Sequence, residues 1–286
     1  MTATEVRTFL LPSGRRIPIL GQGTWGMGEF RGKRANEIAA LRLGLDLGMT
    51  LIDTAEMYGE GGAEEVVGEA IAGRRAEVFL VSKVCPHNAT RKGAVEACER
   101  SLQRLKTDYL DLYLLHWRGT VPLGETFAAF QVLRESGKIS DYGVSNLDAD
   151  DMEEARLLPG GDEIVTDQVL YNLVNRVIEW DLQPWCRERG IVIMAYSPIE
   201  HASGGRSALL TNRVLKRIAV RHDAAPAQVA LAWLLRQNVV VIPKASTLEH
   251  VRENHGALDL TLTNKDLKEL DQEFPPPRRK LPLAMR

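Results

Sequence analysis

Four residues that could together protonate a carbonyl group are spread over more than sixty positions of the chain. Asp53 and Tyr58 lie in the run TLIDTAEMYG, Lys83 ends VFLVSK, and His116 ends LDLYLLH. Each of the three runs is apolar and typical of a buried strand, and a helical pattern separates each from the next. Because a βα barrel collects its chemistry at the ends of successive strands, we expect these side chains to meet.

The chemistry that they predict is proton transfer from a phenol. A free phenol has a pKa near 10, so a neighbouring Lys83 is expected to lower the pKa of Tyr58 toward a useful range. Asp53 would keep Lys83 charged and in place, and His116 would direct a carbonyl oxygen by a hydrogen bond. Taken singly, each residue has an ordinary alternative, such as a surface tyrosine, a solvated lysine, a turn-capping aspartate or a structural histidine.

Strand-like and helical segments alternate from about residue 17 to residue 257. The expected strands are 17–24, 50–55, 78–84, 110–117, 139–146, 164–172, 191–198 and 239–245. The expected helices are 34–48, 62–73, 90–106, 124–137, 148–156, 178–189, 211–222, 226–237 and 247–256. Eight βα units indicate an α/β fold, a (β/α)8 TIM barrel that occupies residues 1–286 as a single domain.

Three pieces lie outside this repeat. Residues 7–18 contain two short strand-like runs around Ser13-Gly14, which predict an N-terminal β-hairpin that plugs the barrel bottom. Residues 199–210 form a loop with Ser203, Gly204 and Gly205 in succession, which we interpret as a lid that orders on cofactor binding, with Arg206 as its cation. After residue 262 a C-terminal helix is expected, followed by a tail that three consecutive prolines keep extended over the surface.

Composition narrows the class of protein. Apolar residues make up 44% and charged residues 26%, and the formal net charge is −2, so nothing favours nucleic acid or a membrane surface as a partner. The apolar runs are too short to cross a bilayer, and the N-terminus has no apolar core typical of a signal peptide. Three cysteines without CxxC spacing indicate reduced thiols, no metal site and a cytoplasmic protein, which we expect to be a monomer.

Seven short runs in order resemble the aldo-keto reductases. They are GQGTWGMG, DTAEMYG, VSKV, LLHW, GVSN, AYSP and IPKAS with REN following, and together they cover essentially the whole chain. The resemblance implies an oxidoreductase that reduces an aldehyde or ketone to an alcohol. A hydride would come from NADP(H) and a proton from Tyr58, with Lys83, Asp53 and His116 assisting.

The resemblance also implies where the dinucleotide lies, since no GxGxxG run heads a βαβ unit. Ser145, Asn146 and Gln168 would bond the carboxamide, Tyr196 would stack on the nicotinamide, and Ser197 would cover the pyrophosphate. The remaining expected cofactor contacts are Thr24, Trp25, Asp53, Lys244, Ser246, His250, Glu253 and Asn254. The pair Ser145-Asn146 also has an alternative interpretation as a helix N-cap.

The adenosine end departs from the family pattern. Lys244 matches the lysine expected at the ribose 2′-phosphate, but His250 stands where an arginine is usual and Ala245 where a serine is frequent. A histidine is only partly charged near its pKa of about 6.5 and cannot form the bidentate fork, although Arg252 could substitute. No acid is expected to face the 2′ site, with Glu249 the nearest concern. NADP(H) is therefore the expected cofactor, and NAD(H) is not excluded.

The expected substrate pocket consists of Trp25, Met57 and Trp117, an apolar wall around the polar groups. Short dicarbonyls, aliphatic or aromatic aldehydes and sugar-derived ketones all fit it. Two other classes of protein remain open. One is a non-catalytic redox sensor that binds the dinucleotide as a regulatory subunit. The other is a Schiff-base aldolase that uses Lys83, which a neighbouring Asp53 disfavours because it keeps the amine protonated.

Overall fold

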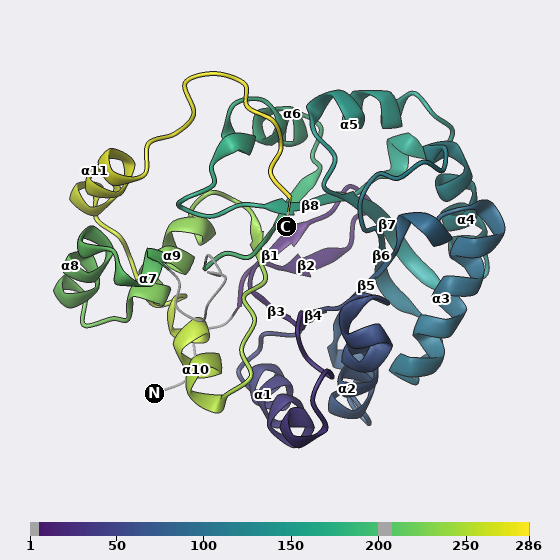
Figure 1. The fold of residues 1–286 in the computed structure, drawn as a ribbon, viewed down its shortest axis with the longest axis horizontal. Coiled ribbons are helices and arrows are strands. Elements are labelled where there is room, and N and C mark those ends of the chain that lie inside the picture. The colour runs from purple at the N-terminus through teal and green to yellow at the C-terminus, as the bar shows by residue number, and fades with distance from the viewer. Residues whose placement is uncertain (1–5, 200–207, 286) are drawn as a thin grey trace.

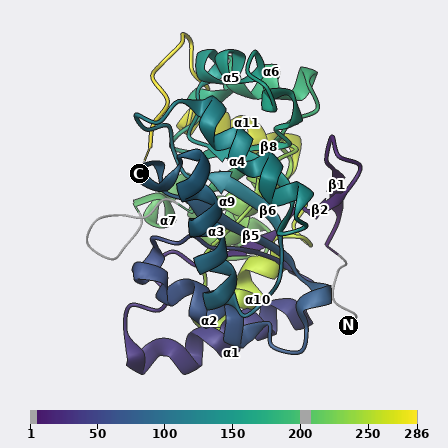
Figure 2. The same cartoon turned by 90° about the vertical axis from the view of Figure 1, so that its right-hand side faces the viewer.

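The computed structural model describes residues 6–199 and 208–285. The chain opens with an antiparallel hairpin of β1 (Thr8–Leu10) and β2 (Arg16–Pro18), in which Phe9 pairs with Ile17. Leu11 and Ile17 are buried among the apolar residues of the barrel interior. In Figure 2 the hairpin lies at the end of the barrel opposite the C-terminus. The predicted hairpin plug is therefore confirmed.

The barrel is a ring of parallel strands (Figure 1). Each strand pairs with the next in chain order, and the bridges Leu20–Val241 and Gly23–Lys244 join the last strand to the first. A Cβ on Gly23 would lie 2.9 Å from the carbonyl oxygen of Ile242, so only glycine allows this close approach. The strands are β3 (Gly21–Gly23), β4 (Leu51–Asp53), β5 (Phe79–Val84), β6 (Leu110–Leu115), β7 (Ile139–Ser145), β8 (Thr166–Leu170), β9 (Val192–Tyr196) and β10 (Val240–Val241).

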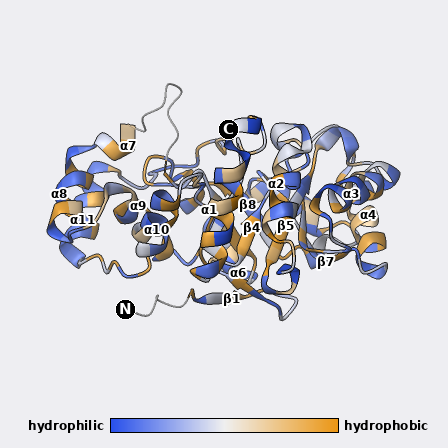
Figure 3. Cartoon of the chain, turned by 90° about the horizontal axis from the view of Figure 1, so that it is seen from below, coloured by the Kyte–Doolittle hydropathy of each residue, from blue (hydrophilic) through white to orange (hydrophobic). Residues whose placement is uncertain are grey.

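Helices surround this ring and shield its outer face. They are α1 (Arg34–Asp46), α2 (Gly62–Ala70), α3 (Arg91–Leu105), α4 (Leu123–Glu135), α5 (Ala149–Arg156), α6 (Leu182–Glu188), α7 (Ala208–Thr211), α8 (Arg213–Arg221), α9 (Pro226–Leu235), α10 (Leu248–Gly256) and α11 (Asn264–Glu273). Seen from below, apolar colour is concentrated on the strands and polar colour on the outer helices (Figure 3). The ring of parallel strands with its outer layer of helices confirms the predicted (β/α)8 barrel. No helix in the described ranges is both long and apolar enough to cross a membrane.

The apolar interior divides into two layers because successive side chains of a strand point to opposite faces. Inside the ring lie residues such as Leu51, Phe79, Val81 and Leu114. Their chain neighbours, such as Leu80, belong to the larger cluster between the strands and the helices. Buried on both faces, the strands are almost continuously apolar, as parallel strands require.

Two predicted elements are broken in the structure. The expected strand 17–24 is divided between the hairpin and β3, with Ile19 and Leu20 between them. Pro18, which ends β2, has no backbone N–H to donate. The expected helix 178–189 is a 3-10 turn, η6 (Val177–Glu179), followed by α6, and the side chain of Asp181 accepts the backbone N–H of Leu182 where α6 begins.

The C-terminal tail is extended, as predicted. It leaves α11 and runs toward α5 and α6 before ending near the strand ends of the barrel (Figure 1). Lys280 forms ion pairs with Asp150 at 2.8 Å and Asp181 at 3.3 Å, so the tail is tied to the N-terminal ends of α5 and α6. The central part of the predicted lid, residues 200–207, lies outside the described residues.

Candidate active site

The alternation of the barrel strands decides which polar side chains enter the site. Asp53 follows the inward-facing Leu51 by two residues, Lys83 follows Val81, and His116 follows Leu114. Tyr196 likewise follows the inward-facing Met194 by two residues. A side chain two residues beyond an inward apolar residue also points inward. Each of these polar groups therefore lies on the inner face at the carboxyl end of its own strand.

The structure brings three of the four predicted catalytic residues into direct contact. The Lys83 Nζ lies 2.8 Å from the Asp53 Oδ2 and donates to the Tyr58 hydroxyl at 3.3 Å. It also donates to the carbonyl oxygen of Thr54 at 2.8 Å, so all three of its protons have acceptors. Lys83 is fully buried and Asp53 is 2% exposed. The fourth residue, His116, packs edge-on against the Tyr58 ring with centroids 5.6 Å apart.

The electrostatics differ from expectation at Tyr58. Burial raises the pKa of the phenol, and the positive charge of Lys83 opposes this only in part. Burial by itself would lower the pKa of Lys83, but Asp53 and then Tyr58 more than compensate and raise it. Lys83 therefore lowers the Tyr58 pKa, as predicted, but the predicted net lowering is wrong because desolvation of the phenol, which the sequence does not show, outweighs it. A protonated phenol beside a permanent ammonium group is nevertheless the form that a proton donor requires.

His116 is held neutral. Burial lowers its pKa to about 2, and the nearby Lys83 charge acts in the same direction. Its Nδ1 is buried without a hydrogen-bond partner among the described residues. A neutral imidazole donates one hydrogen bond and accepts another, so His116 can offer an N–H to a carbonyl oxygen without carrying charge. Trp117 packs against it at 5.0 Å and is half-buried.

Polar groups from three further strands form a second cluster beside the quartet. Gln168 donates to the other Asp53 oxygen at 2.7 Å, and Ser145 donates to the Gln168 carbonyl at 2.7 Å. Asn146 donates to the His116 carbonyl at 3.1 Å and accepts from the Tyr196 hydroxyl at 2.9 Å. This set of amide and hydroxyl groups fits a carboxamide, which needs both donors and an acceptor.

The helix-capping alternative for Ser145-Asn146 is wrong. The N-cap of α5 is Asp148, whose side chain accepts from the backbone N–H of Asp151. Ser145 is instead the last residue of β7, and Asn146 has a left-handed backbone with φ of 61°. Both side chains are therefore oriented by the barrel and not by the helix.

The other predicted residues of this end line the loops around the quartet. Thr24 is fully buried, and its backbone N–H and its hydroxyl both donate to the Asp53 carbonyl, so its role is to hold Asp53. Trp25 and Met57 are 58% and 45% exposed, an available apolar surface. Ser197 is half-buried with φ of 47°, and its carbonyl accepts from Asn172.

The predicted adenosine residues gather where β10 leads into α10. Lys244 pairs with Gly23 across the barrel seam, and its Nζ lies 3.4 Å from the Ser246 hydroxyl. His250 is exposed in the first turn of α10, which Thr247 caps, while Glu253 is half-buried and Asn254 is buried. Arg252, considered as a substitute phosphate ligand, donates to the Leu248 carbonyl of its own helix at 3.4 Å.

Three charged residues near Lys244 were missed from the sequence. Burial lowers the pKa of Lys244, the charge of Lys33 lowers it further, and Glu37 and Glu29 oppose these effects. Two acids, Glu37 and Glu29, are thus near enough to Lys244 to affect its pKa, and neither is Glu249, the acid considered from the sequence. All three precede or begin α1, which lies beside α10 in Figure 1. Their proximity follows from helix packing across the barrel seam, for which the local sequence carries no signal.

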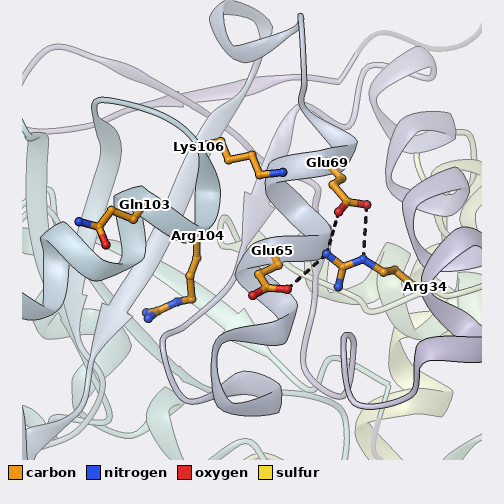
Figure 4. A pocket seen from close by; sticks show the side chains of 6 residues that line it. All are labelled: Arg34, Glu65, Glu69, Gln103, Arg104 and Lys106. Carbon is orange, nitrogen blue, oxygen red and sulfur yellow. Dashed lines mark hydrogen bonds and ion pairs between the residues drawn. The ribbon is translucent and has the colours of Figure 1, made fainter.

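A separate cavity of about 380 Å³ lies on the outer surface among α1, α2 and α3 (Figure 4). Arg34 bridges Glu65 and Glu69 across it, and Arg104 is paired with the buried Glu64. Its charges are therefore largely satisfied by one another, and none of the predicted site residues lines it. We assign no chemistry to this cavity.

Comparison with known proteins agrees with this geometry. The family model described as "Aldo/keto reductase family" matches residues 19–273. Methylglyoxal reductase YeaE of Escherichia coli is 53% identical over 270 residues, which cover 94% of this chain and 95% of that protein. Glyoxal reductase of Bacillus subtilis is 34% identical over 257 residues, 86% of this chain and 87% of that protein.

A solved structure extends the similarity to three dimensions. The aldo-keto reductase of Klebsiella pneumoniae in complex with NADPH superimposes with a TM-score of 0.95 at 47% identity, over 99% of this chain and all of that one. The match to the family model over most of the chain and the arrangement of the barrel agree with each other. The chain belongs to the aldo/keto reductase family.

Proposed function

We propose that this protein uses NADPH to reduce a small reactive carbonyl compound, with a 2-oxoaldehyde such as methylglyoxal as the first candidate. The observation that carries the proposal is the buried contact of Lys83 with both Asp53 and the Tyr58 hydroxyl, beside a neutral His116. The substrate class is supported by the two relatives named as methylglyoxal and glyoxal reductases.

Each side chain has a distinct task in the proposed reaction. When bound, the nicotinamide supplies the hydride that reduces the carbonyl carbon. His116 donates a hydrogen bond to the carbonyl oxygen and orients it toward Tyr58. The Tyr58 hydroxyl gives its proton to that oxygen as charge develops there, and the Lys83 ammonium stabilises the phenolate that remains. Asp53 keeps Lys83 charged, and water returns the proton to Tyr58 after product leaves.

The residues of the second cluster fit the nicotinamide end of the cofactor. The amide and hydroxyl groups of Ser145, Asn146 and Gln168 would pair with the carboxamide, and the Tyr196 ring would support the nicotinamide. At the other end Lys244 and Ser246 would meet the 2′-phosphate, with His250, Glu253 and Asn254 near the adenosine. NADPH is the preferred form because two lysines lie at this end, and the acids beside them leave NADH possible.

The residues around Tyr58 and His116 suit a substrate with an apolar side. Trp25, Met57 and Trp117 supply the apolar surface, and Tyr58 and His116 supply the polar groups that converge on one oxygen. We further propose that the protein acts as a monomer in the cytoplasm. Its three cysteines are all free and buried, which suits a reducing compartment.

The test is an assay of NADPH oxidation with methylglyoxal, glyoxal and a panel of aliphatic and aromatic aldehydes, repeated with NADH. We expect turnover with NADPH and the highest kcat/KM with a 2-oxoaldehyde. Cofactor binding without turnover of any carbonyl compound would instead support the redox-sensor alternative. Borohydride trapping of an adduct on Lys83 would support the aldolase, and its absence is expected.

A further inference from the structure

The proposed proton donor stands on a turn with little regular support. Tyr58 opens the 3-10 turn η2 (Tyr58–Gly61), in which Gly59, Glu60 and Gly61 all have left-handed backbones. Between the end of β4 and this turn the Tyr58 N–H donates to the Ala55 carbonyl at 3.1 Å within the same segment, and few backbone hydrogen bonds tie the segment to β5. Thr54 donates to Val81 at 2.9 Å, but the bond from Glu56 to the Lys83 carbonyl is long, at 3.4 Å. Another contact must fix the phenol relative to Lys83.

The Glu56 carboxylate supplies that contact. Its Oε1 accepts the backbone N–H of Cys85 at 2.7 Å and the side-chain amide of Asn88 at 3.0 Å. Its Oε2 faces Arg100 of α3 at 3.9 Å. The side chain of Glu56 is only 9% exposed, so these are hydrogen bonds to a largely desolvated charge, a strong type.

The two loops joined in this way carry the catalytic pair. Glu56 lies between Asp53 and Tyr58 in the chain, whereas Cys85 follows Lys83 by two residues. Asn88 belongs to the short 3-10 turn η4 (Pro86–Asn88) immediately beyond. The carboxylate therefore connects the segment that bears the acid and the phenol to the segment that bears the lysine, and no strand pairing reaches this point.

We propose that Glu56 is a positioning residue, which holds the Tyr58 hydroxyl at its distance from Lys83 by joining the loops after β4 and β5. The inference rests on the proposed carbonyl reduction, because it concerns the same proton donor. At 3.3 Å the Lys83–Tyr58 contact is already near the limit of a hydrogen bond, so a small displacement breaks it. A displacement of about 1 Å in a catalytic group can lower the rate about 100-fold.

The chain offers variants that separate positioning from general damage. Glu56→Ala removes the connection, while Glu56→Gln keeps an amide oxygen that can still accept from Cys85 and Asn88. Asn88→Ala removes one donor and leaves the carboxylate. Glu60→Gln is the matched control, since Glu60 is exposed in the same turn and its side chain has no hydrogen bond or ion pair with residues 6–199 or 208–285.

The measurement is single-turnover reduction of methylglyoxal with enzyme in excess over NADPH, together with the NADPH dissociation constant. The rate constant reports the chemical step in folded enzyme, whereas the stoichiometry of NADPH binding in the same titration reports the fraction that is folded. We expect the rate constant of Glu56→Ala to fall about 10- to 100-fold. Glu56→Gln and Glu60→Gln should stay within about threefold of wild type. NADPH affinity should change less than about twofold in all of them.

The outcomes distinguish this inference from the proposed function. If wild type oxidises no NADPH with any carbonyl compound, the function is wrong and the positioning role falls with it. If wild type is active and Glu56→Ala keeps its rate constant and loses only NADPH-binding stoichiometry, Glu56 is merely structural and the inference is refuted. If Glu56→Ala does not fold, Asn88→Ala decides. A rate constant of Asn88→Ala at least threefold below that of Glu60→Gln supports the inference, and a rate constant equal to that of Glu60→Gln refutes it.

Discussion

Replacing the buried ion pair of Lys83 and Asp53 should affect the stability and the turnover of the protein differently. The two groups are 2.8 Å apart with side chains 0% and 3% exposed. At that separation an effective dielectric constant of ~20 gives an attraction of ~6 kcal/mol. Removing either partner leaves the other as a buried charge with no counter-ion, which typically costs about 3–5 kcal/mol. We therefore expect Asp53→Asn and Lys83→Met each to lower Tm by about 6–20 °C.

The double variant is the informative one. Asp53→Asn with Lys83→Met replaces the ion pair by a neutral pair of similar volume, which in other proteins is often neutral or stabilising. We expect its Tm to recover to within about 5 °C of wild type, a coupling energy of several kcal/mol in the double-mutant cycle. Its turnover should remain at least about 100-fold below wild type, because no cation is left to stabilise the Tyr58 phenolate.

The assay combines thermal unfolding at neutral pH with NADPH oxidation under saturating methylglyoxal. A double variant whose loss of Tm equals the sum of the two single losses would refute the coupling between Lys83 and Asp53. A double variant that retains more than about a tenth of wild-type turnover would refute the catalytic role of the lysine. A double variant that is as unstable as the sum of the single variants and yet active would contradict both the coupling and the catalytic role of Lys83.

The remaining predictions concern other groups. Tyr58→Phe should keep NADPH affinity and lose about 100- to 10,000-fold in turnover, and retention of a third of the activity would remove Tyr58 from the mechanism. Burial raises the pKa of Tyr58 and lowers that of His116 to about 2, so neither group should change its protonation between about pH 6 and 9. The kcat for reduction should therefore not vary with pH in that range on account of either group. A pH dependence of kcat in that range that Tyr58→Phe abolishes would contradict this. His250→Arg should tighten NADPH by about 1–2 kcal/mol more than NADH, and Lys33→Ala should weaken NADPH selectively; equal changes for both cofactors in a fluorescence titration would place these residues away from the 2′-phosphate. Burial of Asp167 raises its pKa well above the usual value, which the backbone of Leu147 opposes only in part, and neither carboxyl oxygen has a good hydrogen-bond partner among the described residues. Its folded pKa thus exceeds its unfolded pKa, so the contribution of Asp167 to stability is lost as pH rises above about 4, and Asp167→Asn should raise Tm at pH 8 but not near pH 4.

The residues of the candidate active site could be predicted because their positions depend on the alternation of side chains along each strand. Asp53, Lys83 and His116 each stand two residues beyond an inward apolar residue, and that spacing is visible in the sequence. The barrel then determines the rest, since the carboxyl ends of parallel strands meet at one edge. Their individual catalytic roles remain predictions, although their mutual contacts are observed.

The errors arise where a property depends on packing between distant segments. The pKa of Tyr58 rises because its phenol is desolvated where it meets Lys83 and His116, residues of other strands that no local pattern brings near it. The N-cap of α5 lies at Asp148 because β7 continues through Ser145, and only the strand pairing with Gln168 fixes where β7 ends. The role inferred for Glu56 depends likewise on a contact with Asn88, thirty-two residues away.

Cofactor preference is harder to predict than the reaction because it too depends on packing between distant segments. The proposed nicotinamide end is built from strand ends, so Gln168 reaches Asp53 directly and its geometry follows from the barrel. The proposed adenosine end is built from the start of α1 and α10, which meet across the barrel seam. There Lys33 and Lys244 bring two positive charges together while Glu29 and Glu37 oppose them. The balance of these four charges, more than His250 alone, should therefore set the preference for NADPH over NADH.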